Sequence, residues 1–175
     1  MHSHLASVLG LLLALTRSGL SAQQAACTLL TPGDVEAATG AKLLEAHKTD
    51  MVIPSGPQKG QTVNGCMWGI PGNGMIAISM MPFPQGASRQ AMMAKLEEVY
   101  GKLKAQHWAE EKKAFADGTC SVMTPPPGKE KLPIMSGCVT EAKGLVLSSA
   151  FMSPTQKLSM AQARALTDKA LSHLH

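Results

Sequence analysis

The strongest apolar run of the sequence lies near its beginning, where every residue from Leu5 to Leu15 is apolar or small. Eleven positions suit the core of a signal peptide, whereas a membrane-spanning helix needs about 20 apolar residues. Polar residues then break the run, and Ala22 supplies the small residue expected before a cleavage point. The pattern predicts a signal peptide over residues 1–22, with a buried N-terminal helix as the alternative.

Two later segments begin with capping boxes, which mark helix starts. Thr31 and Asp34 form the first box, and Gly40 ends a helix of about two turns. Ser159 and Gln162 form the second box, and apolar residues then recur at helical spacing to the end of the sequence. The sequence therefore predicts a short helix after residue 31 and a terminal helix after residue 159.

A third helix is predicted between Ala87 and Lys104. Its apolar residues fall at i, i+4, i+7 and i+11, which places them on one stripe of a helix surface. These residues are Met92, Leu96, Val99 and Leu103. Lysine and glutamate occupy the opposite side, which we interpret as a solvated face rather than a membrane-binding one.

Alternating apolar and polar positions predict strands in the rest of the chain. The segments are 41–53, 63–70, 75–83, 119–124, 134–140 and 145–152, and 110–116 fits either a strand or a helical tail. Short turns join neighbouring strands, which makes them antiparallel. The predicted fold class is α+β, an antiparallel sheet of about six strands flanked by helices. The order is helix, three strands, helix, three to four strands, helix, arranged as a sandwich.

All four cysteines, Cys27, Cys66, Cys120 and Cys138, follow the predicted signal peptide. Export leads to an oxidising compartment in which disulfides form. Of the three possible pairings, the predicted hairpin favours Cys120 with Cys138, which leaves Cys27 for Cys66. No Cys-x-x-Cys motif occurs and the spacings do not fit a zinc ribbon, so structural disulfides are favoured over redox or zinc sites. Gln24 stands where a lipid-attachment motif has leucine, which argues against an anchor on Cys27.

Charge and aromatic content exclude a nucleic-acid partner. The formal net charge is +4, falling to +3 when Arg17 leaves with the signal peptide, and aromatic residues make up 3% of the chain. Proteins that bind nucleic acid cluster basic residues and offer aromatic stacking platforms. A protein or a small ligand is therefore the expected partner, with no stable membrane insertion after cleavage.

The twelve methionines suggest copper binding as a hypothesis, because thioethers select Cu(I). The pairs Met80-Met81 and Met92-Met93 do not recur as a Met-x-x-Met array. Adjacent residues of a strand also point to opposite faces. Since methionine fills irregular core space, we interpret these residues as packing, and no metal or cofactor site is predicted.

No catalytic site can be assigned from the sequence. His47 and His107 stand alone, and no nucleophile elbow or zinc-protease motif occurs. The best candidate cluster for acid–base chemistry is His107 beside Trp108, with Glu110 and Glu111 close by. An ordinary surface segment is the favoured interpretation, so no catalytic residue is predicted.

Two cysteine-containing segments carry a resemblance to a known group of proteins. Cys27 to Val35 reads Cys-Thr-Leu-Leu-Thr-Pro-Gly-Asp-Val, and Cys66 to Trp68 reads Cys-Met-Trp. This pattern resembles small exported bacterial proteins of unknown function, similar to secreted lipoproteins and to extracellular sensor domains of bacterial kinases. The resemblance implies a PsbP-like fold, an antiparallel sheet sandwiched by helices, and supplies no catalytic residues.

The sequence thus predicts a signal peptide followed by one disulfide-stabilised domain over residues 23–175. We expect a non-enzymatic binding or interaction domain in the periplasm or outside the cell. The alternatives are a cell-envelope enzyme with an unrecognised site and a methionine-based copper protein.

Overall fold

A computed structural model describes residues 25–55, 58–84, 86 and 88–174. The predicted signal peptide, residues 1–22, lies outside them. The described elements are η2 (Ala26–Thr28), α1 (Pro32–Thr39), β1 (Ala46–Lys48), β2 (Met51–Val52), β3 (Thr62–Ile70), β4 (Gly74–Pro82), α2 (Arg89–Lys104), β5 (Ala109–Ala114), β6 (Gly118–Thr124), β7 (Ile134–Ala142), β8 (Leu145–Ser153) and α3 (Met160–Ser172).

The strands form one curved antiparallel sheet in the order β1-β3-β4-β8-β7-β6-β5, and β2 also pairs with β3. The α+β class and the flanking helices are confirmed. The strand count of about six is corrected to eight in the described part of the chain. The sheet is continuous because β4 pairs with β8, which joins the first group of strands to the second.

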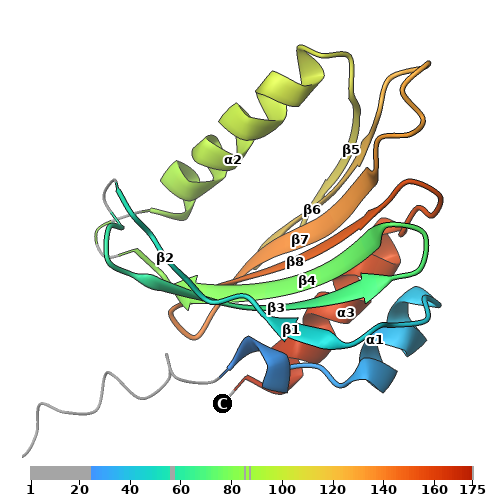
Figure 1. Ribbon diagram of the computed structural model, residues 1–175. Coiled ribbons are helices and arrows are strands. Elements are labelled where there is room, and N and C mark those ends of the chain that lie inside the picture. Colours follow the sequence, from blue (N-terminus) through green and yellow to red (C-terminus); the bar gives the residue numbers. More distant parts are fainter. Residues whose placement is uncertain (1–24, 56–57, 85, 87, 175) are drawn as a thin grey trace, which may run out of the picture.

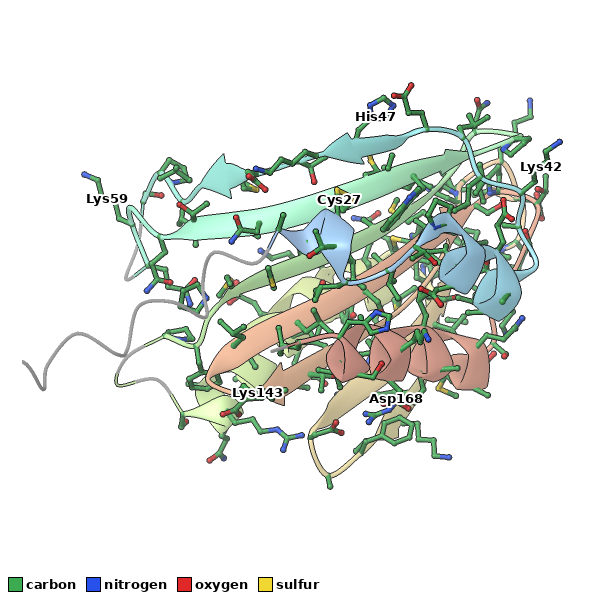
Figure 2. The ribbon with its side chains drawn as sticks, turned by 90° about the horizontal axis from the view of Figure 1, so that it is seen from below. Cys27, Lys42, His47, Lys59, Lys143 and Asp168 are labelled. Carbon is green, nitrogen blue, oxygen red and sulfur yellow. A yellow bond between two sulfur atoms is a disulfide. The ribbon has the colours of Figure 1, made fainter. Side chains whose placement is uncertain are left out.

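Helices α1 and α3 lie on one side of the sheet, and α2 lies on the other (Figure 1). The core fills the space between the sheet and α3. Figure 2 views the molecule from this side. The core includes fully buried large side chains from β3, β4, β8 and α3, among them Trp68, Ile76, Ile78, Leu147, Phe151 and Leu166.

Both predicted capping boxes are present. The Thr31 hydroxyl accepts a hydrogen bond from the Asp34 backbone N–H at 3.2 Å, and the Thr31 N–H donates to the Asp34 carboxylate. Ser159 and Gln162 make the same exchange at the start of α3. Gly40 ends α1 with φ of 69°, a left-handed conformation that glycine adopts without steric cost.

The single strand predicted over residues 41–53 is wrong, because two short strands replace it. Between them the Asp50 carboxylate accepts a hydrogen bond from the Gly65 backbone N–H at 3.1 Å. The Asp50 side chain thus takes the place of a backbone carbonyl as the acceptor of this hydrogen bond, and the regular pairing with β3 is interrupted between β1 and β2. Glycine at residue 65 permits this close approach, since a Cβ there would lie 2.3 Å from Thr49 Oγ1 and 3.0 Å from the Thr49 carbonyl oxygen.

The ambiguous segment 110–116 is a strand over its first part. β5 pairs with β6 and forms the sheet edge opposite β1. Alternation along β5 turns Glu110 toward α2, where it pairs with Lys104, and Glu111 toward the α3 side, where it pairs with Lys157. The two neighbouring carboxylates therefore lie on opposite faces.

Two disulfides join the four cysteines in the pairing that the hairpin argument favours. Cys27–Cys66 ties η2 to β3, and Cys120–Cys138 joins directly paired residues of β6 and β7. Three of these side chains are almost completely buried, and Cys27 is partly buried against the core. The first bond therefore anchors the N-terminal segment to the core.

A second attachment runs from α3 to the turn between β5 and β6. The Arg164 guanidinium donates two hydrogen bonds to the Asp117 carboxylate, at 2.7 and 2.9 Å, and lies over the Phe115 ring. These hydrogen bonds hold the pKa of Asp117 below its usual value, and the reciprocal interaction raises the pKa of Arg164. The pair fixes the outer end of the sheet to α3.

Removing a disulfide should lower the free energy of unfolding by about 3 to 4 kcal/mol, because each bond closes a loop in the unfolded chain. The loop between Cys27 and Cys66 spans 39 residues and that between Cys120 and Cys138 spans 18. We therefore expect the C27A/C66A variant to lose more stability than C120A/C138A in urea titrations. Equal stability of wild type and both variants would contradict a structural role.

The Asp117 pair predicts a pH-dependent contribution to stability. A carboxylate whose pKa falls on folding stabilises the fold above its unfolded value of about 3.9, and the contribution disappears as pH drops through the lower folded value. At pH 7, D117N should cost about 1 kcal/mol, because the pair is partly solvated. The difference in the free energy of unfolding between D117N and wild type should vanish toward pH 2.

The matched control is E111Q, which breaks the exposed pair with Lys157 and should cost less than about 0.5 kcal/mol. Urea titration of each variant across this pH range measures both effects. A D117N cost that stays constant down to pH 2 would rule out the ion pair as its source.

Candidate functional site

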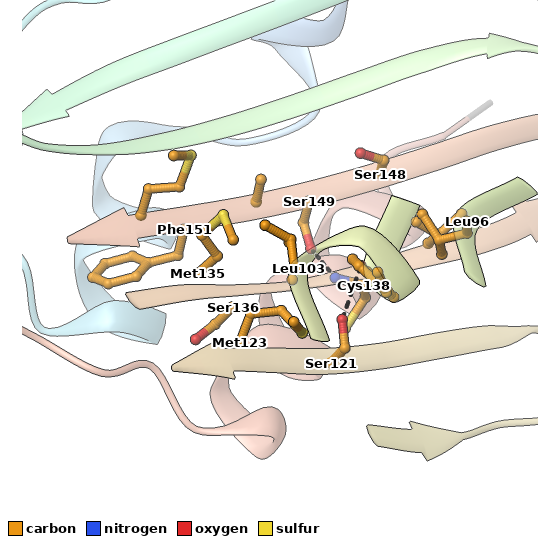
Figure 3. Close-up of a pocket in the computed structure, with 15 residues that line it drawn as sticks. Leu96, Leu103, Ser121, Met123, Met135, Ser136, Cys138, Ser148, Ser149 and Phe151 are labelled. Carbon is orange, nitrogen blue, oxygen red and sulfur yellow. Dashed lines mark hydrogen bonds between the residues drawn. The ribbon is translucent and has the colours of Figure 1, made fainter. Parts of the chain in front are cut away.

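The described residues enclose a cleft between α2 and the sheet face opposite α3. The cleft contains two cavities, of about 260 and 350 Å³, which share Leu96, Val139 and Ser148 in their walls. Leu96 and Leu103 project from α2 toward strands that carry Met123, Met135 and Ser148 (Figure 3). The two cavities are therefore neighbouring compartments under one helix.

Methionines form one row across the floor of the cleft. Met75 of β4 pairs directly with Met152 of β8, which pairs with Met135 of β7, which pairs with Met123 of β6. Directly paired residues of an antiparallel sheet project from the same face. We call Met75, Met152, Met135 and Met123 the methionine row. Its last three members line the smaller cavity.

A row of small residues lies next to the methionine row, two positions along each strand. It consists of Ala77, Ala150, Gly137 and Ser121, in direct register across the same four strands. Because these side chains are short, they leave space beneath α2 that longer side chains would fill. The cavities thus follow from the residue types on this face.

Helix α2 is attached to this face less tightly than α3 is to the other. Among its described side chains none is fully buried, whereas Ala163, Leu166, Thr167 and Ala170 of α3 all are. A hydrogen bond of 2.9 Å between the Tyr100 and Ser121 hydroxyls connects α2 to β6. Ion pairs of Glu97 with Lys112 and of Lys104 with Glu110 connect it to β5.

The walls of both cavities are apolar apart from hydroxyl groups. No charged side chain is among the described residues that line them, and the polar groups are those of Tyr100 and of serines. Ser79 donates to Ser148 at 3.4 Å, so these two hydroxyls already have partners. Such a space suits an apolar molecule and offers no strong acid, base or nucleophile.

The candidate catalytic cluster is not assembled. His107 is exposed in the turn after α2, with φ of 65°, and Glu110 and Glu111 point to opposite faces. His47 lies exposed on the outer strand β1 (Figure 2). Among the residues that the structure describes, neither histidine hydrogen-bonds to an acidic or nucleophilic side chain.

The methionines divide between the core and the cleft. Met80 is 2% exposed in the core, whereas its neighbour Met81 points to the other face and lines the larger cavity with Met92 and Met93. The interpretation of the methionines as core packing therefore holds for Met80, but most of the methionines after the predicted signal peptide line the cleft. Within the described ranges, no group of three histidine, cysteine, aspartate or glutamate side chains could hold a metal ion.

No protein-family model matches the chain, and no curated protein matches it. Among solved structures, the crystal structure of the extracellular domain of PknH from Mycobacterium tuberculosis has a similar fold. The TM-score is 0.55 with 13% sequence identity, over 83% of this chain and 94% of that chain. This likeness is consistent with the resemblance to extracellular sensor domains of kinases. At this identity it establishes the shared fold alone.

None of the described helices is long and apolar enough to cross a bilayer.

Proposed function

We propose that this chain is an exported, non-enzymatic binding domain that holds a small apolar ligand in the cleft between α2 and the sheet. The observation that carries the proposal is the pair of adjoining cavities under α2, of about 260 and 350 Å³. Ligand sites are typically apolar pockets of this order with a few polar groups. An apolar cavity of only about 150 Å³ is enough to bind benzene.

The methionine row supports an adaptable site. Methionine is unbranched and polarisable, and proteins use it on surfaces that accommodate apolar partners of different shape. Helix α2 forms the opposite wall and is attached to the strands through a few side chains. A ligand could therefore enter with a small displacement of α2, while the core under α3 stays intact.

Export to the periplasm or beyond the cell is supported by three observations. Residues 1–22 have the pattern of a signal peptide, all four cysteines form disulfides, and the structural neighbour is an extracellular domain. The proposed mature protein is one disulfide-stabilised domain over residues 23–175, which we expect to recognise a small ligand or to interact with a protein. We do not favour an envelope enzyme, because the described residues that line the two cavities carry hydroxyl groups but no charged side chain.

The second candidate function is Cu(I) binding, and the specific observation in its favour is the methionine row. Met123, Met135 and Met152 come from three adjacent strands and share one face beside a cavity. Thioethers of this kind select soft Cu(I) over harder ions. All four cysteines are in disulfides, so thiolates would not compete for the metal.

Filling the smaller cavity should prevent binding of an apolar probe. Ala150 lines it from β8, and A150F would place a ring in the space beneath α2. We expect the apparent Kd for Nile red, read from its fluorescence, to rise at least about tenfold, since a lost apolar contact of 1.4 kcal/mol has that effect.

The matched control is A94F on the exposed face of α2, which should leave Nile red binding unchanged. Circular dichroism checks that both variants fold. If folded A150F binds the dye as wild type does, the cleft is not the binding site.

The copper candidate is tested by Ag(I), a redox-inert substitute for Cu(I), followed by native mass spectrometry. The variant M123L/M135L/M152L keeps the apolar volume, because methionine and leucine exchange at little cost. One bound Ag(I) per chain should disappear in this variant and persist in the control M51L/M160L. Uptake that is absent in wild type, or equal in both variants, ends the copper interpretation.

A further inference from the structure

Glu110 combines burial with a missing hydrogen-bond partner at the β5 margin of the cleft. Its side chain is 7% exposed, and its Oε2 pairs with Lys104 of α2. Its other carboxylate oxygen, Oε1, is buried and has no hydrogen-bond partner among the described residues. Leaving a buried acceptor unsatisfied is unfavourable, and more so for a charged group.

The position of Glu110 relates this oxygen to the cleft. Glu110 pairs directly with Met123, so it continues the methionine row onto β5 and shares its face. Its partner Lys104 follows Leu103, which lines the smaller cavity together with Met123. The carboxylate therefore belongs to the direct strand neighbour of a cavity-lining methionine, and its ion-pair partner is adjacent in sequence to a cavity-lining leucine of α2.

The other buried side-chain atoms without partners lie elsewhere. Trp68 Nε1 and Thr140 Oγ1 belong to residues that point toward α1 and α3, and Gln61 precedes β3. Within the described chain, Glu110 is thus the member of this group that lies on the cleft face. An unpaired acceptor beside an apolar cavity is the arrangement expected when a ligand supplies the donor.

We propose that the cleft selects a neutral amphiphile whose O–H or N–H head group donates to Glu110 Oε1 and whose alkyl chain follows the methionine row. This inference rests on the proposed function and adds the class of ligand to it. The head group is neutral because Lys104 already balances the charge of Glu110. A carboxylate head group, as in a fatty acid, would place a like charge beside Glu110, which is unfavourable at 4 to 6 Å.

Strand spacing sets the length of the chain. From Glu110 on β5, the row's members Met123, Met135 and Met152 follow on β6, β7 and β8, which is three strand intervals or roughly 14 Å. An extended chain of about ten carbons covers that distance. Decanol is therefore a suitable probe, with methyl nonyl ether as a neutral molecule of equal heavy-atom number that lacks the donor, and decanoate as the charged comparison.

Isothermal titration calorimetry with the three probes tests the inference on the folded protein. We expect decanol to bind about tenfold more tightly than methyl nonyl ether, because a hydrogen bond to a charged group contributes on that scale. Decanoate should bind most weakly at neutral pH. Equal affinities of decanol and the ether would overturn the inference while leaving the proposed function intact, whereas no binding of any probe would count against the proposed function itself.

Variants of Glu110 test whether its carboxylate causes the preference for decanol over methyl nonyl ether. E110M extends the methionine row by one residue and should bind decanol and the ether equally, with ether affinity unchanged. E110Q adds an amide donor, so its affinity for decanoate should rise above that of wild type. E111M is the matched control, since Glu111 also pairs with a lysine but points to the opposite face. A decanol preference that survives in E110M, or disappears in E111M, would contradict the assignment.

Discussion

Both faces of the eight-stranded sheet carry apolar side chains, and each must be shielded from water by a helix. The two faces are shielded unequally. On one side α3 buries Leu166 and Ala170 in the same core cluster as Trp68 and Phe151. On the other side α2 buries none of its described side chains completely, and cavities remain beneath it. The unequal burial lets one face stabilise the fold while the other remains open to a ligand.

The difference between the core face under α3 and the cleft face under α2 explains where polar and charged groups are found. The core face uses short internal hydrogen bonds, such as that of 2.7 Å between Ser149 and Thr167, to satisfy its buried hydroxyls. The cleft face instead places its charges at the rim, in the two ion pairs between α2 and β5. Rim pairs hold the helix in place without bringing charge into the cavity walls. Glu110 is the exception, because it belongs to a rim ion pair and yet has a buried carboxylate oxygen on the cleft face.

Features set by neighbouring residues could be predicted from the sequence. The capping boxes at Thr31 and Ser159 depend on groups three positions apart, so the helix starts were found. The cysteine pairing followed from one hairpin. The break between β1 and β2 was missed because it depends on Asp50 meeting Gly65 across strands. The methionine row was missed for the same reason, since its members come from four strands whose register no local pattern specifies.

The bond between Cys120 and Cys138 has a consequence for the identity of the two faces. In a sheet, a slip of one residue between strands exchanges the side chains that point to either side. Such a slip between β6 and β7 would turn the thioether of Met135 toward α3 and bring Ser136 and Cys138 under α2. Because the two cysteines are direct partners, their covalent bond forbids that alternative pairing. The disulfide thus fixes the register of β6 and β7, and with it the side chains that these two strands contribute to the cleft.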